Sequence, residues 1–204
     1  GLAIAASVFW GSMGVCAQYL LQQCSFTPLD LVSMRLVLAG LILLIMERLV
    51  FGRNIISPLK DIRTTVGILV AGLLILVSQL TFMLAVAASN AGTAAIVLTL
   101  VPLICAFWLS ITEKRPLTMR EGICFVLAAS GGFLIVTKGN FSTLDLSFAG
   151  VLWGFVSAIF SAAYSIQPRK LIMKVGVGPV VGFGMLFGGL VASVMNPPWR
   201  SEER

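Results

Sequence analysis

Two uncharged stretches in the middle of the chain decide its fold: residues 66–87 read VGILVAGLLILVSQLTFMLAVA, and residues 91–112 read AGTAAIVLTLVPLICAFWLSIT. Only a few small and polar residues separate them. Coiled into α-helices that rise about 1.5 Å per residue, both stretches are long enough to cross the roughly 30 Å hydrocarbon core of a bilayer. We therefore expect two consecutive transmembrane helices here.

The rest of the chain is also rich in hydrophobic residues and poor in charged ones. Hydrophobic residues make up 58% of its 204 residues and charged residues only 11%, whereas roughly a quarter of a soluble domain is charged. Runs of transmembrane length predict seven spans, at residues 2–21, 28–46, 66–87, 91–112, 121–137, 147–167 and 177–195. A membrane β-barrel would instead need alternating segments of about ten residues. We predict an all-α integral membrane protein, a multi-helix bundle whose partner is the lipid bilayer.

The basic residues indicate how the spans are oriented. They collect in alternate connections: Arg48, Arg53, Lys60 and Arg63 after the second span, Lys114, Arg115 and Arg120 after the fourth, and Arg169, Lys170 and Lys174 after the sixth. Short loops rich in Lys and Arg stay cytoplasmic. This predicts a cytoplasmic N-terminus and an external C-terminal tail in the cell membrane. Because the basic residues form no single stripe with interleaved aromatic residues, we expect no nucleic-acid partner.

The two ends of the chain also show an internal repeat. One constant shift in numbering places Phe9 on Phe160, Pro28 on Pro179 and Met34 on Met185. The same shift superimposes the first span on the sixth and the second on the seventh. Because an odd number of spans separates the copies, the second copy is inverted in the membrane. Inverted repeats are typical of secondary transporters, which bind substrate between the halves near the bilayer midplane.

The order of motifs between Gln79 and Thr137 adds a resemblance. The third span ends near Ala85-Val86-Ala87, and after it come the polar turn Ser89-Asn90-Ala91-Gly92, a fourth span with Pro102, then Glu113, a basic loop and a fifth span with Gly131-Gly132. Trp10-Gly11-Ser12 in the first span and Arg35 near the start of the second fit the same pattern. The chain resembles the EamA-type transporters of the drug/metabolite transporter superfamily.

The resemblance implies a ten-helix exporter or importer built from two inverted five-helix repeats. On that pattern, residues 1–138 form the first repeat and residues 147–204 contribute two helices of the second. The chain begins at Gly1 rather than methionine and stops after Asn196-Pro197-Pro198 and a charged tail. We interpret it as a fragment with about seven of ten expected helices.

The resemblance also implies a function, the movement of a small metabolite or drug through a central cavity by alternating access. The alternatives are a noncatalytic membrane scaffold and an inactive truncated transporter, and the internal repeat argues against the scaffold. An enzyme is not expected, because the sequence has no histidine, no paired carboxylates within spans and no GxSxG motif. The four cysteines have no CxxC spacing, so we expect no metal site and no cofactor.

Polar and aromatic side chains inside the spans or at their ends are the candidates for binding substrate. They are Trp10, Gln18, Arg35, Gln79, Asn90, Thr99 and Tyr164. Arginine is costly within hydrocarbon, so Arg35 either extends toward the interface or faces a polar partner or a water-filled path. The other polar groups either line the cavity or link helices through hydrogen bonds worth about 0.6 kcal/mol each. The two aromatic residues fit a substrate contact or simple packing.

Proline and glycine mark two further features of the spans. Pro102 cannot donate its backbone nitrogen to the helix, so we expect a bend there, and a hinge for alternating access is a hypothesis. Small residues at four-residue spacing, Gly150-x-x-x-Gly154 and Gly184-x-x-x-Gly188, allow close approach of helix backbones. We interpret these glycine pairs as packing positions.

Overall fold

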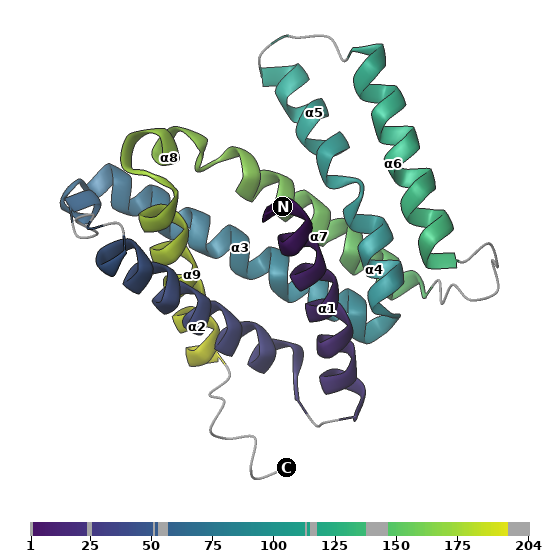
Figure 1. Cartoon of the computed structure of the whole chain (residues 1–204), viewed down its shortest axis with the longest axis horizontal. Coiled ribbons are helices and arrows are strands. Elements are labelled where there is room, and N and C mark those ends of the chain that lie inside the picture. Colours follow the sequence, from purple (N-terminus) through teal and green to yellow (C-terminus); the bar gives the residue numbers. More distant parts are fainter. Residues whose placement is uncertain are drawn as a thin grey trace. The chain divides into compact units, whose positions relative to one another are not determined.

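The computed structural model describes residues 2–23, 26–50, 52, 57–112, 114, 118–137 and 147–195. Within these ranges the chain is helical and contains no strand, which confirms the predicted all-α class (Figure 1). The α-helices are α1 (Leu2–Gln23), α2 (Pro28–Leu49), α3 (Ile62–Ala88), α4 (Ala91–Leu98), α5 (Val101–Thr112), α6 (Met119–Thr137), α7 (Phe148–Ile166), α8 (Arg169–Val175) and α9 (Val177–Met195). A 3-10 turn, η1 (Ser57–Lys60), precedes α3.

Each predicted span is helical in the structure, although a turn at Thr99 and Leu100 divides the fourth. Among the described residues, five helical stretches are long and apolar enough to cross a membrane: Pro28–Leu49, Ile62–Ala88, Ala91–Thr112, Phe148–Val175 and Val177–Met195. Helices α1 and α6 occupy the other two predicted positions. The sequence interpretation was wrong about the connection after the sixth span, which is the short helix α8 and not a loop.

Large apolar side chains remain exposed along the helices. Examples are Phe9 on α1, Leu38 on α2 and Leu190 on α9, and none of them lies in the first or last turn of its helix. A soluble protein does not leave so many large apolar groups in contact with water. The hydrocarbon of a bilayer is the solvent that suits these faces, so the structure is that of a bundle of membrane helices.

The helices group into two compact units. The first unit contains α1, the last turns of α3, α4, α5, α6 and the first half of α7. The second unit contains α2, most of α3, the end of α7, α8 and α9. The grouping follows packing, whereas the predicted repeats 1–138 and 147–204 describe internal symmetry. Those repeat boundaries stay a prediction.

In the second unit, α2 and α9 cross with their backbones in contact. A Cβ built on Gly40 would lie 2.7 Å from the amide nitrogen of Leu186 and 2.9 Å from the carbonyl oxygen of Gly182. The close approaches along the two helices are Val37 with Gly189, Gly40 with Leu186, Leu44 with Gly182 and Glu47 with Gly178. Residue numbers rise on α2 as they fall on α9, so the two helices are antiparallel.

Glycines also bring α9 onto α3 in the second unit. A Cβ on Gly188 would lie 2.6 Å from the carbonyl oxygen of Gly72, and a Cβ on Gly72 would lie 2.6 Å from that of Gly184. Farther along, Leu76 Cβ lies 3.3 Å from the position built on Gly188. These contacts confirm the packing role predicted for Gly184 and Gly188. Numbers rise together on both helices, so α3 and α9 are parallel.

The end of α7 and the helix α8 run along α3 in the opposite direction. Ser78 Oγ and Ser161 Oγ lie 2.5 Å apart, and Gln167 Nε2 donates to the carbonyl oxygen of Gly67 at 3.1 Å. Leu171 of α8 also packs against Gly67. Within this unit, α3 is therefore parallel to α9 and antiparallel to α7, as the predicted alternation of spans requires.

In the first unit, the other predicted glycine pair packs as expected. A Cβ on Gly150 would lie 2.6 Å from Ser89 Oγ, and a Cβ on Gly154 would lie 3.1 Å from Val97 Cβ. The start of α7 thus lies against the end of α3 and against α4. Helix α4 also contacts α1 and α6, and α5 contacts α6.

Candidate functional site

Two of the predicted site residues contact each other in the second unit. Arg35, in the second turn of α2, donates a hydrogen bond from Nη2 to Oε1 of Gln79 on α3. Both side chains are half-buried. Gln79 lies well inside the apolar length of α3, so its amide gives the guanidinium a polar partner where hydrocarbon would give none. The contact joins two membrane helices through their polar side chains.

Further polar groups of the same unit lie on α3, next to Gln79, and on the end of α7. Ser78, next to Gln79, pairs with Ser161 at 2.5 Å, although either hydroxyl can be the donor. Tyr164 is half-buried and follows Ser161 by one turn, which places both on one face of α7. Sequence analysis missed the two serines, because serine is common in membrane helices and only the tertiary fold shows that these two face each other.

Gln18 and Asn90 act at the N-terminus of α4 in the first unit. Asn90 is the N-cap: its backbone is extended and its Oδ1 accepts a hydrogen bond from the Thr93 amide at 2.8 Å. Gln18 Oε1 on α1 accepts from the amide of Ala91 at 3.0 Å. The first turn of a helix has free N–H groups that need such acceptors, above all in a membrane. In this structure both side chains satisfy the backbone of α4.

Thr99 lies at a break in the predicted fourth span. The amides of Thr99 and Leu100 bond to the carbonyl oxygens three residues back, at 3.0 and 3.1 Å, and the α-helix resumes at Val101. Pro102 lacks the N–H that would continue the α-helical pattern, and its ring crowds the preceding turn. Thr99 Oγ1 donates to the carbonyl oxygen of Ile96 at 2.6 Å. The interruption thus falls just before the proline, where one turn of i→i−3 bonds separates α4 from α5 within the stretch Ala91–Thr112.

Trp10 on α1 is 59% exposed. Among the predicted site residues, Arg35 and Gln79 thus contact each other in the second unit. Gln18 and Asn90 both bind the amides at the start of α4 in the first. Among the described residues, no group of three or more His, Cys, Asp or Glu side chains is placed to hold a metal ion.

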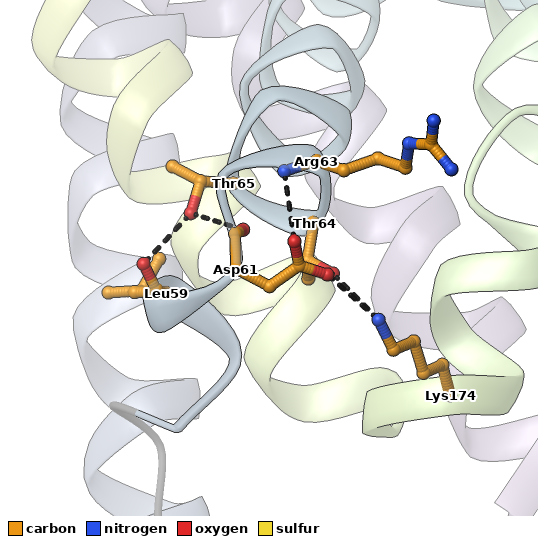
Figure 2. A network of polar contacts seen from close by, with 6 residues as sticks. All are labelled: Leu59, Asp61, Arg63, Thr64, Thr65 and Lys174. Atoms are coloured by element: carbon orange, nitrogen blue, oxygen red, sulfur yellow. Dashed lines mark hydrogen bonds and ion pairs between the residues drawn. The ribbon is translucent and has the colours of Figure 1, made fainter.

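A polar network at the start of α3 was missed by sequence analysis (Figure 2). Asp61 precedes α3 and accepts hydrogen bonds from the amide of Arg63 at 3.2 Å and the hydroxyl of Thr64 at 2.7 Å. Lys174 on α8 forms an ion pair with Asp61 Oδ2 at 2.8 Å. An aspartate just before an apolar helix is a helix-start signal that the sequence contained.

The same contacts explain the acidity of Asp61. The hydrogen bond from Lys174 contributes most, and those from Thr64 and the Arg63 amide add to it. Together they lower the pKa of the Asp61 carboxyl from 3.8 to about 2. The carboxylate is therefore charged throughout the physiological pH range.

These observations define the class of protein as an integral membrane bundle of close-packed apolar helices with polar pairs between them. Residues 1–137 match the EamA-like transporter family, and the chain belongs to that family. It is also similar to the uncharacterized inner membrane transporter YicL of Salmonella typhimurium, with 39% identity over 191 residues. That alignment covers 91% of this chain and 62% of the relative, so the chain spans about three fifths of the relative's length. No solved structure matches the chain.

Proposed function

We propose that this protein is a secondary transporter that moves small organic metabolites or drugs across the membrane by alternating access. The substrate occupies a cavity between two inverted repeats, residues 1–138 and 147–204. Membership of the EamA-like family and similarity to a protein named as an inner membrane transporter support this function. The basic loops are cytoplasmic in this proposal, as is the N-terminus.

The packing of α2 against α9 is the observation that carries the proposal. The predicted internal repeat would make these two helices equivalent, and a two-fold axis in the membrane plane makes equivalent helices antiparallel. Val37 meets Gly189 and Gly40 meets Leu186, near the middle of both helices. A symmetry axis between inverted halves would pass through such a crossing. Alternating spans already make the second and seventh helices antiparallel, so it is their direct crossing near the middle of both helices that supports the inverted repeat.

The contacts also divide the seven candidate residues by role. Arg35, Gln79 and Tyr164 lie half-buried within the spans and are proposed to line the substrate path. Gln18 and Asn90 are proposed to keep the start of α4 folded, because their side-chain oxygens accept its free amides. Thr99 and Pro102 mark the break between α4 and α5, which is proposed as the hinge. Trp10 is proposed as an aromatic contact for the apolar part of a substrate.

Cysteine labelling from either side of the membrane tests the inversion. A version in which the native cysteines are replaced by serine receives one new cysteine, Ser25→Cys or Met173→Cys. In intact cells, a membrane-impermeant maleimide should label position 25 directly and position 173 only after permeabilisation. Labelling of both positions from one side contradicts the inverted arrangement.

A flux assay tests transport itself. The protein is reconstituted in liposomes and screened for uptake of labelled amino acids, nucleotide precursors and cationic drugs. The variant Arg35→Ala, which lacks a residue proposed to line the substrate path, is measured beside it. We expect uptake of at least one class of compound. Uptake should fall by about tenfold or more in Arg35→Ala, because the loss of a charged contact worth about 1.4 kcal/mol lowers binding tenfold. Correct topology without any flux would favour the scaffold alternative.

A further inference from the structure

Helix α8 packs against the N-terminal end of α3, which Asp61 directly precedes. Lys174 Nζ lies 2.8 Å from Asp61 Oδ2 and 3.5 Å from the hydroxyl of Thr64 (Figure 2). Farther along α3, Leu171 packs so closely on Gly67 that a Cβ added there would lie 2.5 Å from Leu171 Cδ1. One ionic contact and one apolar contact therefore hold α8 against the first turns of α3.

The two partners of the ion pair are held differently. Asp61 is fixed in place, because its carboxylate also accepts from the Arg63 amide and the Thr64 hydroxyl at the start of α3. Lys174 lies on the seven-residue helix α8, which follows Pro168 and is capped by Gly176, whose φ of 92° favours glycine. A short helix between a proline and such a glycine has hinge points at both ends. We therefore expect α8 to be the segment that moves and Asp61 to be the anchor.

Burial changes sharply beneath the ion pair. The side chains of Lys174 and Asp61 are 63% and 46% exposed, whereas Thr64 and Ile68, directly along α3, are 2% and 1% exposed. Water thus reaches the ion pair but not the helix face below it. An exposed ion pair contributes little to stability and is weakened by salt, so it breaks and reforms readily. These are the properties of a reversible closure.

We propose that the Asp61–Lys174 pair is a latch that keeps α8 closed over the start of α3, and that its release opens the α3 face beneath to water. The inference rests on the proposed alternating access, which requires one membrane face to open and close. Asp61 belongs to the first predicted repeat and Lys174 to the second, so the latch links the parts that would separate. Both residues lie on the side of the membrane that carries the basic loops.

The test measures how fast a buried reporter reacts. Ile68→Cys is placed in the protein with its native cysteines replaced by serine, and inside-out vesicles are treated with a membrane-impermeant maleimide. Lys174→Met should raise the labelling rate about two- to fivefold, as expected for an exposed ion pair. Asp61→Ser removes the charge but keeps a good N-cap residue, and it should give the same rise. The double variant should react no faster than either single variant.

The control is Lys170→Met, which removes the same charge from the same short helix at an exposed position. It should leave the labelling rate unchanged, and 0.5 M salt should accelerate the parent but not Lys174→Met. Ala71→Cys, which is also fully buried, serves as a second reporter if Ile68→Cys perturbs the fold. Equal rates for Lys174→Met and Lys170→Met overturn the latch. The assay needs no substrate, so failure of the latch and failure of transport give different results.

Discussion

Two polar contacts, one within α3 and one just before its first residue, differ in their surroundings. Gln79 binds Arg35 inside the apolar length of the helix, where both side chains are half-buried, and Asp61 binds Lys174 at the exposed start of the helix. In hydrocarbon a lost partner leaves a charged group without water, whereas at the surface water replaces it. The first contact should therefore stabilise the fold, and the second is free to serve as a movable link.

The largest effect is expected for Gln79→Leu. The substitution leaves the Arg35 guanidinium without its amide partner, and hydrogen bonds to charged groups contribute about 1.5–3 kcal/mol. We expect a loss of about 1–2 kcal/mol, since membrane helices find alternative partners in part. This loss is measured as the difference in the free energy of unfolding in mixed micelles. Gln79→Glu, which keeps an acceptor for Arg35, is the control. A Gln79→Leu variant as stable as the parent would show that burial does not distinguish the two contacts.

An intermediate effect is expected for Asn90→Ala, which removes the N-cap of α4. Loss of a capping side chain costs about 1 kcal/mol, because the Thr93 amide loses its acceptor. Asn90→Asp, which keeps the accepting oxygen, should retain most of the stability. Unfolding in the same micelles compares the two variants. A loss as large in Asn90→Asp as in Asn90→Ala would assign the side chain a role other than capping.

A small effect is expected when the exposed contact is broken by Lys174→Met. Because water and salt already screen the pair, the melting temperature should fall by less than in Asn90→Ala. The fall should also shrink as salt is raised from 0.05 to 0.5 M, since the Debye length drops well below about 10 Å. Thermal unfolding followed by circular dichroism measures both. If the melting temperature of Lys174→Met fell more than that of Gln79→Leu and the fall did not depend on salt, the exposed contact would be the stabilising one, contrary to the proposal.

The smallest expected effect is the change with pH in the stability that Asp61 contributes. The pKa of Asp61 is lowered in the folded protein to about 2, so its charged form stabilises the fold above the pKa of the unfolded chain, near 3.9. This stabilisation is complete at neutral pH and is lost as the pH falls through about 2. The difference in melting temperature between the parent and Asp61→Ser should be constant from pH 8 to 5 and disappear toward pH 2. A difference that already changes between pH 8 and 6 would require another titrating group.

The sequence predicted helix positions well because length and hydrophobicity decide them. Residues 91–112 and 177–195 begin and end where Ala91–Thr112 and α9 do. The break at Thr99 and Leu100 was expected as a bend at Pro102, because proline disturbs the turn that precedes it. Helix α8 was missed because its basic residues were explained by orientation alone.

The site was predicted less completely, because its contacts join residues far apart in sequence. Arg35 and Gln79 were both candidates, but only the packing of α2 on α3 shows that they meet. The capping role of Asn90 was visible in principle, since asparagine before a helix is a common start signal. No sequence pattern links Asp61 to Lys174, because that contact depends on how α8 lies on α3.

The antiparallel packing of α2 and α9 is the central claim, and disulfide cross-linking tests it most directly. Glu47→Cys combined with Gly178→Cys should form a disulfide in native membranes, since these positions are in contact. Glu47→Cys combined with Gly189→Cys should not, because Gly189 lies about 16 Å farther along α9. Cross-linking of the second pair and not the first would place the helices parallel and contradict the inverted repeat.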